Sequence, residues 1–99
     1  TGGEVVNTLR DIRPDLCLMG TNSIDSRVGL TDSDWEITDV KKAMIQVSEK
    51  VAILTISDKL DSTQKIRIAD IRKVDYLVTE LSPDADLLKP YQKAGLQVL

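Results

Sequence analysis

The chain has 99 residues, room for one domain at most, and its 41% hydrophobic and 29% charged residues are ordinary for a folded globular protein. The formal net charge of −3 offers no positive field for a phosphate backbone, which argues against nucleic-acid binding by this chain itself. Histidine is absent, which removes the commonest general base and metal ligand, so we expect no catalytic residue, no metal site and no cofactor.

The compartment is predicted from what the sequence lacks. No apolar stretch approaches the roughly 20 residues that span a bilayer, and no signal-peptide pattern is present, so we expect a cytoplasmic protein without membrane contact. The single cysteine, Cys17, lies in an apolar run and predicts a reduced, buried thiol. Both ends favour a segment excised from a longer protein, because the first residue is Thr1 and residues 96–99 fall in a predicted strand.

The first part of the chain predicts a helix, a strand and a long loop. Apolar residues recur at helical spacing over residues 4–13, and Pro14 ends that helix. The apolar run 16–19, closed by Gly20, is typical of a strand covered on both faces. Residues 20–32 are largely polar, and we predict a functional loop there because it is long for a strand-to-helix connection.

A second helix and a central strand follow. Ser33 is predicted to cap the helix, with Glu36 bonding back to its amide in a capping box. The apolar stripe of this helix is expected at Ile37, Val40, Met44 and Val47. The β-branched run 51–56 is the strongest strand signal in the chain and predicts a central parallel strand.

Beyond the central strand, residues 57–65 are polar and predict a second loop. Residues 66–71 alternate as a short edge strand, and residues 75–79 form a further buried strand. The alternating order predicts an α/β fold with a mainly parallel sheet flanked by helices.

The C-terminal residues predict one more helix and the strand 96–99. Ser82 would cap this helix with Pro83 at its first position, and Gly95 would end it. Pro90 is expected to kink or split it, because proline removes a helical hydrogen bond.

Candidate ligand-binding residues lie in the loops after the predicted strands, where open α/β sheets bind ligands. The first loop carries hydroxyl, amide and carboxylate groups that suit a polyol. Its candidates are Thr21, Asn22, Asp25, Gly29 and Thr31. The alternative is a structural loop in which Asn22 and Asp25 bond to their own backbone in Asx turns.

Lys59 is the candidate of the second loop, where its ammonium could neutralise a phosphate or a carboxylate. The alternative is a solvated surface lysine. Glu36 could face the same cleft, although the capping box accounts for it. Asp25 and Lys59 could also act as an acid and base pair in sugar isomerisation.

Several motifs occur in one order along the chain. They are residues 15–25, similar to a strand and the loop G-x-N-G-I-D; residues 28–31, a G-L-T turn; residues 36–45, similar to E-x-x-x-K-x-x-M-I; the strand 51–54 with Lys59; residues 75–79, D-x-L-V-T; and residues 94–99. In this order they resemble the second half of the effector-sensing domain of the DeoR family of bacterial transcriptional repressors, over nearly all of residues 1–99.

The resemblance implies the fold superfamily of ribose-5-phosphate isomerase and the CoA transferases. It also implies a phosphorylated sugar, or a related metabolite, that controls the binding of operator DNA by an N-terminal winged helix. That winged helix and the family's phosphate-gripping G-T-T loop lie outside residues 1–99. By position the resemblance assigns the ligand to Asn22, Asp25, Gly29, Thr31 and Lys59, with Glu36 as a further candidate.

The chain departs from the family pattern at two places. Ser23 stands where the family usually has glycine. The family also has an aspartate ahead of the lysine loop, where this chain has Ile56-Ser57-Asp58-Lys59, and Asp58 is the candidate replacement. Three functions stay open: a sensor, an enzyme of the isomerase or transferase kind, and an assembly module. We also expect a homo-oligomer, because a truncated sheet exposes an edge and an apolar face that a second copy could cover.

Overall fold

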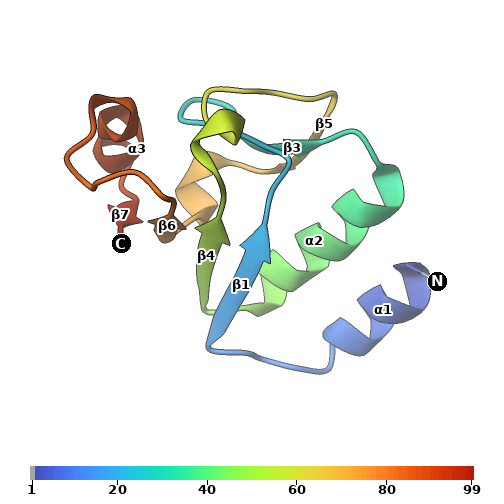
Figure 1. Cartoon of the computed structure of the whole chain (residues 1–99). Helices are drawn as coiled ribbons and strands as arrows, with labels where there is room; N and C mark the ends of the chain where they lie inside the picture. The colour runs from blue at the N-terminus through green and yellow to red at the C-terminus, as the bar shows by residue number, and fades with distance from the viewer. Residues whose placement is uncertain (1) are drawn as a thin grey trace.

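Two sheets organise the chain, as seen in a computed structural model that describes residues 2–99 (Figure 1). The larger sheet is parallel, and its strands in spatial order are β1 (Leu16–Gly20), β4 (Lys50–Leu54), β6 (Tyr76–Val78) and β7 (Gln97–Val98). The smaller sheet is antiparallel and consists of β2 (Ser23–Asp25), β3 (Gly29–Asp32) and β5 (Ile66–Ala69). The predicted α/β fold with a mainly parallel sheet is confirmed.

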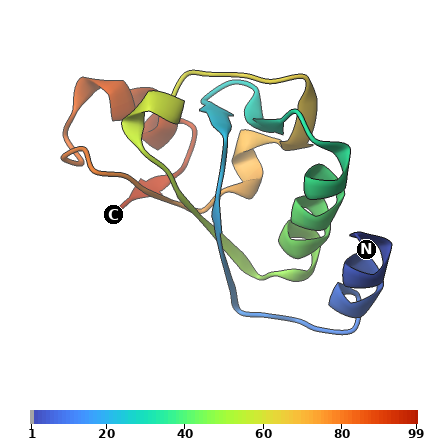
Figure 2. The same ribbon diagram turned by 45° about the vertical axis from the view of Figure 1, so that its right-hand side comes forward.

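Helices lie beside the parallel sheet at its two lateral edges (Figures 1 and 2). The helices α1 (Gly2–Leu9) and α2 (Trp35–Val47) pack on each other beside β1, whereas α3 (Lys89–Lys93) lies next to β6 and β7. Helix α1 ends earlier than predicted, since residues 10–11 form a turn. No helix within residues 2–99 has the length and apolar character needed to cross a membrane.

The parallel sheet buries one face and leaves the other open. Cys17 and Met19 on β1 and Ile53 on β4 are buried in the core. On the opposite face, the side chains of Leu16, Leu18 and Leu54 are 46%, 61% and 44% exposed. The prediction that β1 is covered on both faces is therefore wrong: its apolar residues are continuous in sequence, but only alternate ones reach the core.

The predicted loop 20–32 is also wrong, because most of it is the β2–β3 hairpin. Its polar side chains are buried with partners: the Ser23 hydroxyl donates to the Thr31 carbonyl at 2.8 Å. Gly29 has φ +107°, and a Cβ there would lie 2.1 Å from the Ala69 carbonyl oxygen on β5. Satisfied polar residues and a turn glycine look like a loop in sequence, and here they form a buried hairpin.

The start of α2 differs from the predicted capping box. Asp34, not Ser33, is the N-cap, and its carboxylate accepts from the amides of Glu36 (2.9 Å) and Ile37 (3.1 Å). The Ser33 amide instead donates to the Asp32 carboxylate at 2.6 Å. Glu36 accepts from the Gly2 amide at 2.9 Å, so its side chain faces α1.

The apolar stripe predicted for α2 is also displaced. The buried residues of the helix are Thr38, Ala43 and Ile45. Ile37 is exposed, and the other three predicted stripe residues are half-buried. The helix therefore packs through a face of small and β-branched residues, next to the groove beside β1 that Met44 and Val47 line.

The predicted C-terminal helix begins later than Ser82. A 3-10 turn (Asp86–Leu88) precedes α3, and Ser82 instead donates to the Asp84 carboxylate. Pro90 lies in the first turn of α3, which confirms the predicted split. Gly95, at φ +109°, follows the C-cap as expected.

The remaining predicted strands are confirmed with shorter bounds. β4 is central, between β1 and β6, and β7 pairs with β6. β5 pairs only with β3, so it is an edge strand as predicted, but of the smaller antiparallel sheet. Cys17 is buried, and that burial raises the pKa of its thiol.

Candidate functional site

The carboxyl ends of three adjacent parallel strands surround one open cavity of about 450 Å³. Each strand and the turn after it contribute part of the lining. The residues are Gly20 and Thr21 after β1; Leu54, Thr55, Ile56 and Lys59 after β4; and Val78, Thr79 and Glu80 after β6. This is the edge of a parallel sheet at which α/β proteins bind ligands, so we take it as the candidate site.

Lys59 is the one cation in that lining, and it sits on a short, well-bonded 3-10 turn (Ser57–Lys59). The Lys59 amide donates to the Ile56 carbonyl at 3.0 Å. Its own carbonyl accepts from the Ser62 hydroxyl at 2.6 Å. The backbone that carries the ammonium is therefore fixed on both sides of the residue.

Glu80 is a lining residue that the sequence did not indicate. Its carboxylate accepts from the Ser57 hydroxyl (2.5 Å), the Ser57 amide (2.8 Å) and the Thr79 hydroxyl (2.7 Å). These bonds, that of the Ser57 hydroxyl first, lower the pKa of Glu80 to about 2. Glu80 therefore remains an anion, and it fixes the first residue of the turn that carries Lys59. Its position directly after the strand 75–79 is the one signal that could have found it.

Thr21 and Asn22 lie at the end of β1. The Thr21 hydroxyl donates to the Ser23 carbonyl at 2.9 Å, and Thr21 lines the cavity. The Asn22 amide donates to the Asp32 carboxylate at 3.1 Å, and Asn22 does not line the cavity. Of the predicted ligand residues, the structure brings Thr21 and Lys59 together.

Gly29 and Thr31 belong to the hairpin rather than to the cavity. Thr31 is buried. Its hydroxyl accepts from the Gln64 backbone amide at 2.8 Å and also contacts the Ser23 hydroxyl at 2.5 Å. Gly29 supplies the positive φ of the hairpin turn. Their contacts hold the hairpin together, and neither residue lines the cavity that Thr21 lines.

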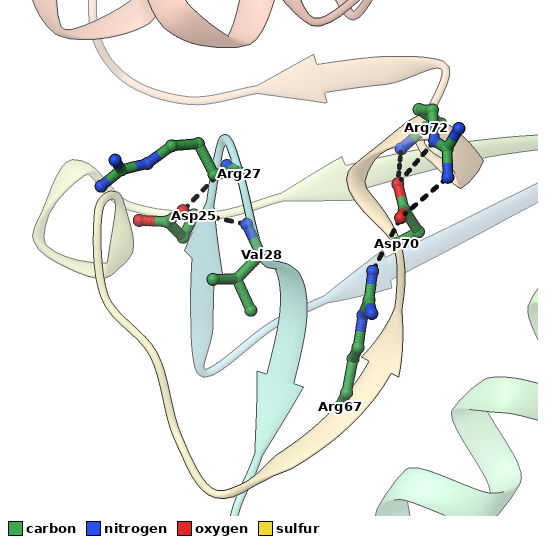
Figure 3. Close-up of polar contacts among 6 residues, drawn as sticks. All are labelled: Asp25, Arg27, Val28, Arg67, Asp70 and Arg72. Atoms are coloured by element: carbon green, nitrogen blue, oxygen red, sulfur yellow. Dashed lines mark hydrogen bonds and ion pairs between the residues drawn. The ribbon is translucent and has the colours of Figure 1, made fainter.

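Asp25 lines a separate hollow of about 700 Å³ between the hairpin turn and α3. Its carboxylate accepts from the amides of Arg27 (2.8 Å) and Val28 (3.0 Å), as Figure 3 shows. These bonds, that of Arg27 first, lower the pKa of Asp25. This is the Asx-turn arrangement weighed as the alternative. Asp25 and Lys59 line no common cavity, so the geometry gives no support to an acid and base pair.

A larger hollow lies between α1 and α2, with a volume of about 770 Å³. Its lining includes Trp35, Asp39 and Lys42, on helix surfaces away from the strand ends. We favour the smaller cavity, because it combines the strand ends with Lys59 and three threonines.

Comparison with known proteins agrees with this architecture. The family model of the DeoR C-terminal sensor domain matches residues 1–81. The HTH-type transcriptional repressor GlcR of Bacillus subtilis is 30% identical over 98 residues, which cover 99% of this chain and 38% of GlcR. The glycerol-3-phosphate regulon repressor of Haemophilus influenzae is 28% identical over 83 residues, covering 84% of this chain and 32% of that protein.

A third relative, the HTH-type transcriptional regulator GlpR of Haloferax volcanii, is 28% identical over 85 residues, covering 86% of this chain and 33% of GlpR. The chain thus spans about a third of the length of the curated relatives it matches. Since the family model covers residues 1–81 of the 99, the chain belongs to the DeoR C-terminal sensor domain family.

Proposed function

We propose that this chain is the effector-sensing part of a transcriptional repressor of sugar metabolism, and that it binds a phosphorylated sugar at the ends of β1, β4 and β6. The observation that carries the proposal is that Lys59 lines one cavity together with Thr21, Thr55 and Thr79 at the ends of three adjacent parallel strands. Relatives named as a glycerol-3-phosphate regulon repressor and as GlcR support the class of function.

The charges of the cavity suggest how such a ligand would be oriented. The Lys59 ammonium offers three donors to a phosphoryl group, and Lys59 is the one cation among the residues that line the cavity. The Glu80 anion repels a phosphate but accepts from sugar hydroxyls. The phosphoryl end would therefore lie toward Lys59 and a hydroxyl end toward Glu80. A volume of about 450 Å³ is within the range of small-ligand sites.

The rest of the proposal concerns the longer protein. Operator DNA would be held by an N-terminal winged helix outside residues 1–99, since this chain has a net charge of −3. Effector binding would alter the hold on DNA without converting the sugar, in keeping with relatives that are named as transcriptional regulators. Turnover of a sugar phosphate by the purified protein would favour the enzyme alternative instead.

Thermal melting of the full-length protein against a panel of sugar phosphates tests the proposal. A compound present at about 100 times its dissociation constant adds about 2.7 kcal/mol to the free energy of unfolding. We expect one compound to raise the melting temperature, and Lys59→Ala to remove that shift. The matched control is Lys65→Ala, which removes an exposed lysine from the same loop outside the cavity lining. A rise in melting temperature in Lys59→Ala equal to that of the wild type would contradict the assignment of the binding site to this cavity.

A further inference from the structure

The hydroxyl of Tyr91 on α3 joins three segments of the chain at one buried point. The Tyr91 side chain is 0% exposed. Its hydroxyl accepts from the Asp61 backbone amide at 2.8 Å. The single phenolic proton lies between two acceptors, the Asp61 carboxylate at 2.8 Å and the Ile24 carbonyl on β2 at 3.2 Å. Burial raises the pKa of Tyr91, which keeps the hydroxyl protonated as a donor.

Asp61 needs such a partner because of its backbone. Its φ of +56° lies in the left-handed region, which disfavours residues other than glycine, although aspartate tolerates it better than most. The hydrogen bonds to Tyr91 engage both the amide and the side chain of Asp61. They therefore stabilise a conformation that the local sequence alone does not favour.

Asp61 follows Lys59 by two residues, so the Tyr91 hydroxyl fixes the far side of the turn that carries the ammonium. The next residue, Ser62, donates its amide to the Ile24 carbonyl at 3.1 Å and its hydroxyl to the Lys59 carbonyl at 2.6 Å. Glu80 fixes the near side through Ser57. The turn is held at both ends by residues from the C-terminal fifth of the chain.

We propose that Tyr91 is a positioning residue for effector binding: it holds the turn after β4 so that the Lys59 ammonium faces the cavity. The proposal rests on the proposed function. Tyr91 is buried and does not line the cavity, so it acts through Asp61 rather than by touching the effector. Tyr91 lies beyond residues 1–81, which the family model matches. With this role, the segment after residue 81 would also contribute to the site.

The first test needs no ligand and uses Tyr91→Phe in the full-length protein. The substitution keeps the ring in the core and removes the hydroxyl. We expect amide hydrogen exchange over residues 59–62 to become about tenfold faster, the loss expected of one buried hydrogen bond. Tyr76→Phe is the matched control, since it removes a half-buried hydroxyl on β6. Equal protection of residues 59–62 in both variants would overturn the proposal.

The second test asks whether Tyr91 acts through Lys59. Affinities for inorganic phosphate and glycerol 3-phosphate are measured in wild type, Tyr91→Phe, Lys59→Ala and the double variant. We expect Tyr91→Phe to bind about tenfold more weakly, and to add nothing in the Lys59→Ala background, because coupled residues are not additive. Additive losses would indicate general destabilisation and would overturn the positioning role.

A variant on the surface guards against misfolding of Tyr91→Phe. Asp61→Gly removes the carboxylate partner from an exposed position and accepts the positive φ without strain, and we expect the same loss of affinity with the fold retained by circular dichroism. If wild type binds phosphate compounds and both variants bind like Tyr76→Phe, Tyr91 has no positioning role. If wild type binds no sugar phosphate of the panel, the proposed function fails, and the role assigned to Tyr91 fails with it.

Discussion

At the scale of single residues, hydrogen bonds from nearby groups lower the pKa of several carboxyl groups, among them Glu80 and Asp70. The Ser57 and Thr79 hydroxyls lower the pKa of Glu80, and Arg72 lowers that of Asp70. Figure 3 shows Asp70 between Arg72 and Arg67, whose guanidinium lies 2.7 Å from the carboxylate. These exposed groups act locally, fixing turns rather than building the core.

The low pKa of Glu80 predicts a specific dependence of stability on pH. A carboxyl group whose pKa is lower in the folded state stabilises the fold at pH values above 4.5, the ordinary pKa of the group. This contribution is lost as the pH falls toward the folded-state pKa of about 2. We expect Glu80→Gln to flatten part of the decline in urea midpoint between pH 4.5 and 2. Glu49→Gln is the control, and equal flattening by both variants would contradict the role of Glu80.

The candidate site could be predicted in part from single residues. Lys59 and Thr21 follow buried strands, and the rule that ligands bind at strand ends places them in one cavity. Glu80 could not be assigned, because its role depends on Ser57 lying across from it, 23 residues earlier in the chain. Asp25 carries the same sequence signal as a ligand residue, but its carboxylate bonds to its own turn.

At the scale of elements, the parallel strands could be predicted because short continuous apolar runs mark them, as at residues 51–54. The hairpin β2–β3 could not, because its burial depends on β5, which pairs with it from about 35 residues later. The cap of α2 lies one residue later than predicted, since the Asp34 carboxylate accepts from the helix amides while the Ser33 amide donates to Asp32.

The observed cap predicts how two neighbouring substitutions will differ. Asp34→Ala removes the acceptor of the Glu36 and Ile37 amides, and we expect it to lower the free energy of unfolding by about 1 kcal/mol. Ser33→Ala should have a much smaller effect, since it removes no helix cap. Urea denaturation of both variants measures the difference, and a larger loss in Ser33→Ala would restore the predicted capping box.

At the scale of the whole molecule, the open face of the parallel sheet exposes several large apolar side chains within residues 2–99. Leu16, Leu18 and Leu54 lie on it, next to a groove lined by Leu9 and Ile12. Parallel sheets are ordinarily covered on both faces, so this face requires a partner surface. The edge of β1 next to it has no neighbouring strand within the part of the chain described.

We expect a second copy of the protein to cover this face. Sedimentation velocity of the full-length protein should then show a dimer or a higher oligomer, and Leu18→Glu should shift the distribution toward monomer, because it places a charge in the apolar contact. Lys65→Glu, a change on an exposed loop residue, is the control. A wild-type protein that sediments only as a monomer would contradict this assembly.

The central claim, that Lys59 recognises the phosphoryl group of a sugar effector, is tested most directly by calorimetric titration. The full-length wild type and Lys59→Ala are each titrated with the best phosphorylated sugar of the melting panel and with the same sugar lacking the phosphate. The account predicts that wild type prefers the phosphorylated compound, with an affinity that weakens at high salt, and that Lys59→Ala loses most of that preference. An undiminished preference in Lys59→Ala would contradict it.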